Sequence, residues 1–235
     1  MSEWKVKRFW KEVHVVPEDA GFGIRLDERP VKTPAKRALV APTKAFAEAI
    51  AAEWDAQEEK IDPLKMPFTR TANAALDKVA VQHREVADML AAYGDADLLC
   101  YRADRPDSLI ARQSGQWDPM LDWAENALGA RLRPRTGVMH VAQDAAALAS
   151  LSARVHALGN FELAAFHDLV SLSGSLILGF AAAHDVKPAE QIWDISRLDE
   201  IWQAEEWGRD DDAEAAAGVK KAAFLHAKRV FVLSQ

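Results

Sequence analysis

The chain has 235 residues, of which 49% are hydrophobic and 28% are charged, and its formal net charge is −7. This composition excludes an intrinsically disordered chain, and the single cysteine, Cys100, excludes a fold held by internal disulfides. The negative charge argues against a general nucleic-acid-binding protein. The whole imbalance lies in residues 194–214, which hold nine acidic residues and two arginines, so the rest of the chain is neutral.

The first 42 residues predict a small antiparallel sheet. Four short segments are rich in β-forming residues or alternate between apolar and polar residues. Gly and Pro turns separate them, and the segments are 9–16, 24–26, 31–33 and 38–40.

Helical spacing begins at residue 43. Thr43 is suited to cap a helix whose apolar residues recur every four positions up to Trp54. Two prolines within residues 61–68 predict a connector, and Thr69 is then expected to cap a longer helix that ends near residue 93.

The remainder of the chain is predicted to be mostly helical. The sequence does not decide whether segment 97–101 is a helix or a strand. Residues 107–128 are expected to form one helix, or two if Pro119 lies in the first turn of a second helix. Residues 129–141 are expected to form a loop with one short strand. Four further helices are expected at 144–158, 161–184, 188–207 and 211–233. The expected fold class is α+β, with a small N-terminal antiparallel β/α domain at residues 1–98 and a larger all-α C-terminal domain at 99–235.

A search for catalytic chemistry finds no constellation of residues. Phosphate-binding glycine loops, metal-binding His and Cys motifs and nucleophile motifs are missing from the sequence, and the seven histidines are scattered. Cys100 lies in an apolar segment, which is typical of an inert buried thiol. The longest uncharged run, residues 169–183, is too short to span a bilayer. We therefore expect no catalytic residues, cofactor, metal or membrane insertion, and favour a binding protein.

Residues 193–207 carry the pattern most typical of a binding surface. On one continuous helix, Trp193, Glu200 and Trp207 would align on one face, opposite an apolar face that packs on the domain, and Gln203 would border them. Solvent-facing tryptophans are typical of interfaces. The alternative is a helix covered on two sides by its own domain, with Glu200 paired to an arginine.

The acidic run at residues 209–214 also allows two interpretations. Asp210, Asp211 and Asp212 can complement the dipole of the helix that begins there. They can equally attract a basic partner over long range. Both interpretations are compatible with each other.

The beginning of the chain predicts its compartment. Residues 1–13 lack the apolar core of a secretory signal, and Glu3 and Glu12 do not suit a transit peptide. We expect a cytoplasmic location in a bacterium, or the mitochondrial matrix if the chain is the processed form of a eukaryotic protein.

Six ordered blocks that cover nearly the whole chain resemble the ATP-synthase assembly chaperones often called the "ATP-twelve" family. The blocks are Gly21-Phe22 with LDERPVKTP (26–34), PTKAFAEAIAAEWDAQ (42–57), DPLKMPFTRTAN (62–73), DLLCYRA (97–103), WDPMLDWA (117–124) and SRLDEIWQAEEWG (196–208). The resemblance implies the same two-part fold. It also implies a chaperone that binds the free α subunit of the F-type ATP synthase catalytic head and keeps it from aggregating until it meets β subunits, without nucleotide hydrolysis or a metal.

The resemblance also singles out individual residues. It implies that Glu200 is the main functional residue, and that Trp54 and Arg70 have structural roles in their blocks. Trp202 is a departure, because many members of the family have tyrosine at this position. The residues expected to bind the partner are Trp193, Glu200, Gln203, Trp207, Asp210 and Asp211. The chain is expected to be a monomer.

Two other functions stay open at this stage. One is an enzyme that binds a small anionic substrate in an inter-domain cleft through Arg70, His83 or Arg112. The other is a structural adaptor that remains in a finished complex. A pocket with convergent polar groups would favour the enzyme, and retention in the mature complex would favour the adaptor.

Overall fold

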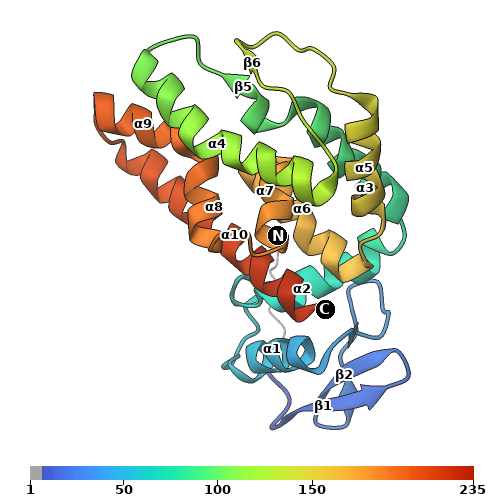
Figure 1. Cartoon of the computed structure of the whole chain (residues 1–235). Coiled ribbons are helices and arrows are strands. Elements are labelled where there is room, and N and C mark those ends of the chain that lie inside the picture. The colour runs from blue at the N-terminus through green and yellow to red at the C-terminus, as the bar shows by residue number, and fades with distance from the viewer. Residues whose placement is uncertain (1–6) are drawn as a thin grey trace. The chain divides into compact units, whose positions relative to one another are not determined.

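The computed structural model describes residues 7–235, so the beginning of the chain, including Glu3, lies outside the described residues. The chain forms two compact units. The described part of the first comprises residues 7–83, 159–165 and 229–235, and the second comprises 84–158 and 166–228. The predicted α+β class is confirmed, with an antiparallel sheet near the N-terminus and helices beyond it (Figure 1). The predicted domain boundary between residues 98 and 99 stays a prediction.

The sheet of the first unit is built around one central strand. Strand β2 (Gly21–Leu26) pairs antiparallel with β1 (Val13–Glu18), β3 (Arg29–Pro30) and β4 (Val40–Ala41). The β1–β2 register places Val13 opposite Leu26, and Ile24 and Leu26 are buried. The predicted sheet is therefore present.

Helix α1 (Lys44–Asp55) confirms the predicted cap. The Thr43 hydroxyl accepts a hydrogen bond from the Phe46 amide at 3.1 Å. The Phe46 ring is fully buried and meets the edges of Phe68 and Phe161, with centroids 6.0 and 5.7 Å away. This aromatic cluster holds three sequence-distant segments of the first unit together.

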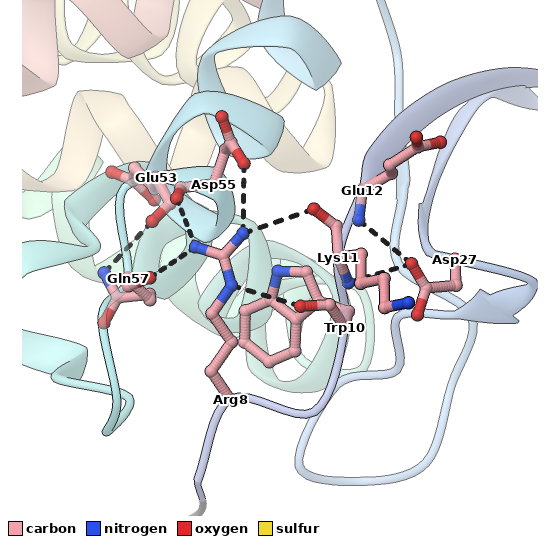
Figure 2. A network of polar contacts seen from close by, with 8 residues as sticks. All are labelled: Arg8, Trp10, Lys11, Glu12, Asp27, Glu53, Asp55 and Gln57. Carbon is pink, nitrogen blue, oxygen red and sulfur yellow. Dashed lines mark hydrogen bonds and ion pairs between the residues drawn. The ribbon is translucent and has the colours of Figure 1, made fainter.

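The end of α1 is tied to the start of the described chain by Arg8, as Figure 2 shows. The Arg8 guanidinium donates to the carbonyls of Asp55 and Gln57 at 2.7 and 2.5 Å, and to the carbonyl of Trp10 at 3.2 Å. The backbone carbonyls at a helix C-terminus lack helical partners, and Arg8 satisfies this need. Nearby, Asp27 Oδ1 accepts the amide hydrogens of Lys11 and Glu12 (Figure 2).

The expected single helix from Thr69 to residue 93 is wrong. The chain instead forms a series of shorter segments. These are the 3₁₀ turn η1 (Pro63–Lys65), helix α2 (Pro67–Ala74), the π-helical segment η2 (Ala75–Val79), helix α3 (His83–Ala91) and the 3₁₀ segment η3 (Ala92–Ala96). Helix α2 begins two residues before Thr69, whose hydroxyl donates to Glu53 at 2.8 Å. The Glu53 carboxylate also accepts the Phe68 and Thr69 amides, so a residue of α1 caps α2. Burial raises the pKa of Glu53.

The second unit is helical apart from one short parallel pair of strands. Strand β5 (Tyr101–Arg102) follows the 3₁₀ turn η4 (Leu98–Cys100) and pairs with β6 (Arg135–Thr136). Helix α4 (Asp107–Leu128) is one piece and contains Pro119. The later helices are α5 (Ala145–His156), α6 (Asn160–Ser173), α7 (Leu176–Ala183), α8 (Ala189–Ser196), α9 (Leu198–Trp207) and α10 (Asp211–Leu233) (Figure 1). The beginning of α6 and the end of α10 belong to the first unit.

A fully buried aspartate organises the break between α6 and α7. The Asp97 carboxylate accepts the amide hydrogens of Leu99 and Ile177, both at 3.0 Å. Ser175 caps α7 by accepting from the Leu178 amide, and Gly174 takes a positive φ of 71°. The predicted continuous helix over 161–184 is therefore two helices.

Two further properties of the described chain concern membrane spans and metal binding. None of the helices in the described chain is long and apolar enough to cross a membrane. Residues 7–235 also contain no cluster of three His, Cys, Asp or Glu side chains suited to hold a metal ion. Cys100 is buried, and burial raises the pKa of its thiol to about 12.

Candidate partner-binding surface

The segment expected to be one helix over 188–207 breaks at Arg197. This residue has φ −104° and ψ 17°, and its amide donates to the carbonyls of Trp193 and Asp194. The Ser196 hydroxyl donates to the Trp193 carbonyl at 2.6 Å, which helps to close α8 before α9 begins. The alignment of Trp193, Glu200 and Trp207 on one continuous helix is therefore wrong.

Trp193 is a core residue of the second unit and does not face solvent. Its side chain is 3% exposed, and its ring packs against Phe224 of α10 with centroids 5.7 Å apart. The Arg197 guanidinium lies 5.8 Å from the Trp193 ring centroid and covers it from the other side of the helix break. The expected exposure of Trp193 is corrected because α10, which follows later in the sequence, covers this face of α8.

Glu200 lies in the first turn of α9 and forms an ion pair. Its carboxylate is 2.7 Å from Arg197 Nη2, and the Glu200 side chain is half exposed. The pairing with an arginine, given above as the alternative, is present. An exposed pair of this kind contributes little to folding stability, and half of the Glu200 side-chain surface stays open to solvent.

Trp207 is the most exposed aromatic side chain among residues 7–235, with 76% of its surface accessible. It lies in the last turn of α9 and contacts Trp202 edge-on, with ring centroids 5.8 Å apart. Trp202 is itself buried, and Gln203 beside it is exposed. Trp207 therefore rests one edge on the unit and presents its remaining surface to solvent.

The chain turns back immediately after Trp207 (Figure 1). Gly208 adopts φ 95°, a conformation that other residues rarely take, and Asp210 caps α10 by accepting the Ala213 amide at 3.0 Å. We call residues 206–212 the α9–α10 turn. Every residue of this turn is exposed.

The acidic stretch divides into paired and unpaired side chains. Asp194 pairs with Lys221, Glu205 pairs with Arg112, Glu200 with Arg197 and Glu214 with Arg209, and Asp199 accepts from Gln113. Of the nine acidic side chains in residues 194–214, all of which the structure describes, three form neither an ion pair nor a hydrogen bond: Glu206, Asp211 and Asp212. All three lie in the α9–α10 turn. The free negative charge of the stretch is thus concentrated beside Trp207.

The first three turns of α10 extend this exposed surface. Residues 211–220 are exposed apart from the partly covered Ala217, and Val219 is 73% exposed. A helix segment with so little packing gains few contacts within its own unit. The α9–α10 turn and this segment form one surface that combines apolar side chains with negative charge.

The structure also shows a hollow that the sequence argument did not identify. It lies between α4 and α8, is open to solvent and has a volume of about 310 Å³. Its lining residues are Gly115, Gln116, Pro119, Lys187, Gln191, Asp194 and Ile195. The available signal was a glycine and a proline four residues apart within one helical pattern. Of the residues proposed for an enzyme site, Arg112 is engaged by both carboxylate oxygens of Glu205.

Fold and surface together define an α+β protein whose candidate site is an exposed surface of apolar and acidic side chains. The profile of the ATP12 chaperone protein family matches residues 7–125, which is half of the chain. The chain belongs to this family, the assembly chaperones of the ATP synthase.

Solved structures and a curated relative agree with this assignment. Atp12 from Paracoccus denitrificans is 49% identical, with a TM-score of 0.96 over 99% of this chain and 100% of that chain. The Atu1473 protein from Agrobacterium tumefaciens is 41% identical, with a TM-score of 0.93 over 97% of this chain and 86% of that chain. The mitochondrial protein atp12 of Schizosaccharomyces pombe is 25% identical over 219 residues, covering 88% of this chain and 75% of that protein.

Proposed function

We propose that this protein binds the unassembled α subunit of the F-type ATP synthase catalytic head and prevents its aggregation before it joins β subunits. Family membership supports the general role. The observation that carries the proposal is Trp207, which is 76% exposed in a turn with three unpaired carboxylates. An exposed tryptophan surrounded by charge is typical of an interface that is covered only in a complex.

The physical properties of this surface suit a chaperone that must hold and then release its client. An unassembled subunit exposes apolar surface that its neighbour normally covers, and such surface aggregates. Trp207 and Val219 supply apolar contact area, while Glu206, Asp211 and Asp212 supply attraction toward a basic client face. A small surface of mixed character binds tightly enough to protect and weakly enough to release.

The proposed contact residues are Glu200, Gln203, Trp207, Asp210 and Asp211. Trp193 has a different role, since it packs between α8 and α10 and supports the orientation of α9. The protein acts as a monomer in this proposal. Its relatives come from bacteria and from mitochondria, so the bacterial cytoplasm or the mitochondrial matrix is the proposed place of action.

Separate pull-downs with purified α and β subunits test the proposal. The wild-type protein is expected to retain α and not β, and Trp207→Ala is expected to lose most of that retention. Equal or preferential retention of β contradicts the assignment of the client. Co-purification with the mature ATP synthase, rather than with free subunits, would indicate an adaptor instead of an assembly chaperone.

A further inference from the structure

The hollow between α4 and α8 has a rigid base. The indole N–H of Trp117 in α4 donates to the carbonyl of Ile195 in α8 at 3.0 Å, and the Trp117 ring is fully buried. Arg102 lies 5.3 Å from the Trp117 ring centroid and pairs with Asp118 at 2.7 Å. These contacts fix the two helices beneath the hollow, so its shape does not depend on a flexible wall.

Two residues in the wall are unfavourable for the helix that contains them. Glycine and proline are the residues least suited to a helix interior, and α4 places Gly115 and Pro119 one turn apart on its exposed side. A side chain at Gly115 would meet nothing within 4 Å, so packing does not require glycine there. Residues that break a local rule without structural benefit are expected at functional positions.

The pair leaves backbone available to a ligand. Pro119 has no N–H, so it cannot donate to the carbonyl of Gly115, its partner in a regular helix. The missing side chain at Gly115 lets another backbone approach the helix closely. The Gly115 carbonyl, at the edge of the hollow, has therefore lost its usual helical donor.

Apart from Ile195, the other side chains that line the hollow are polar. Lys187 carries one positive charge and Asp194 one negative charge, and Asp194 is also paired with Lys221 on α10. Among the described residues, the side chains of Gln116, Lys187 and Gln191 form no hydrogen bond or ion pair. Donors and acceptors are thus mixed around the site, which matches the alternating N–H and C=O groups of a peptide backbone.

The hollow lies next to the surface already proposed for the client. Arg112, one turn before Gly115 and Gln116 on α4, pairs with Glu205 of α9. Asp194 in the wall of the hollow belongs to the same acidic stretch as the α9–α10 turn. A client that contacts α9 can therefore continue along α4.

We propose that the α4–α8 hollow receives an extended main-chain segment of the client, whose N–H groups bond to the Gly115 carbonyl and whose carbonyls accept from Lys187 and the two glutamine amides. This inference rests on the proposed function and names a second contact for the same client. Trp207 and the acidic turn attract and hold the client's surface, while the hollow binds its backbone independently of side-chain identity.

Affinity measurements with the purified α subunit test the proposal. Gly115→Phe fills the hollow and is expected to weaken binding by at least about tenfold. Pro119→Ala returns a donor to the Gly115 carbonyl and is expected to weaken binding by about fivefold, as for the loss of one hydrogen bond. Both variants improve helix propensity, so their melting temperatures are expected to stay the same or rise.

A smaller substitution and a matched control separate filling the hollow from merely changing a helix surface. Gly115→Ala adds one methyl group, which hinders the close approach of a backbone, and is expected to weaken binding less than Gly115→Phe does. Ala153→Phe adds the same ring at an exposed position of α5 and is expected to have no effect. If Gly115→Phe and Pro119→Ala bind the α subunit as the wild-type protein does, the proposed role of the hollow is wrong, while the proposed function is unaffected. Failure of the wild-type protein itself to bind the α subunit overturns both.

Discussion

The Glu200 carboxylate lies 2.7 Å from Arg197, the residue at which α8 ends and α9 begins. The pair therefore joins a helix break to the first turn of the helix that carries Trp207. Arg197 also covers the ring of Trp193, so one arginine links the buried part of this region to its exposed part. This relationship makes the helix break a support for the proposed surface.

Glu200→Lys reverses the charge of a half-exposed side chain and removes its ion pair with Arg197. Because exposed pairs contribute little, the free energy of unfolding should change by no more than about 1 kcal/mol. Capture of the α subunit should be abolished. Helical circular dichroism and thermal melting provide the control. A large drop in melting temperature would place Glu200 in the fold and contradict its role in binding.

Trp193 and Trp207 form a matched pair of tryptophans with opposite environments. Trp193→Ala empties a buried site against Phe224 and should destabilise the protein by about 3–5 kcal/mol. Trp207→Ala removes a mostly exposed ring and should cost less than about 1 kcal/mol while reducing capture of the α subunit. Urea unfolding and pull-downs measure both effects. Normal capture by Trp207→Ala would rule out the proposed contact.

The unpaired carboxylates of the α9–α10 turn should act on the rate of association. Replacing Glu206, Asp211 and Asp212 by Gln, Asn and Asn leaves the Asp210 cap in place. Stopped-flow association should become several-fold slower at low salt and less dependent on ionic strength, because long-range attraction is lost. An unchanged salt dependence would show that the turn does not steer the client.

Asp97 should give the protein a characteristic pH dependence. Complete burial raises the pKa of Asp97 to about 6, above its value of about 4 in an unfolded chain, so folding favours the neutral carboxyl group. The protonated Asp97 therefore makes its whole contribution to the free energy of unfolding below about pH 4. This contribution is lost as the pH rises through about 6. The stability difference between wild type and Asp97→Asn should therefore fall from pH 4 to 6 and level off above 7. Urea unfolding across this range measures it, and a difference that grows with pH would contradict the sign.

Cys100 should not react with thiol reagents in the native protein. It is buried, and the raised pKa of its thiol keeps it protonated at neutral pH. A cysteine introduced at the exposed Gln116 should therefore be labelled selectively, which allows photo-crosslinking from the α4–α8 hollow to the client. Rapid labelling of the wild-type protein would show that Cys100 is accessible.

The parts of the fold that the sequence predicted are those with strong local signals. Thr43 and the spacing of Phe46, Ile50 and Trp54 predicted α1, because a cap and an apolar stripe are both encoded within one segment. Gly174 and Arg197 break helices that the hydrophobic pattern ran through. The first break depends on Asp97, which is distant in sequence, and the second lacks any proline or glycine.

The candidate surface was predicted in part for the same reason. Trp207 is exposed as expected because it lies at a helix end followed by Gly208. Trp193 is buried because Phe224 of α10 packs on it, and periodicity within one helix does not show which later helix covers a given face. The hollow at Gly115 and Pro119 requires two helices, so it becomes visible only in three dimensions.

Light scattering by the free α subunit, diluted from denaturant with and without this protein, tests the central claim most directly. At equal molar concentrations the wild-type protein should suppress aggregation of the α subunit and leave that of the β subunit unchanged. The Trp207→Ala variant, with an unaltered melting temperature, should fail to suppress it. Unabated aggregation of the α subunit in the presence of the wild-type protein, or equal protection of β, would contradict the account.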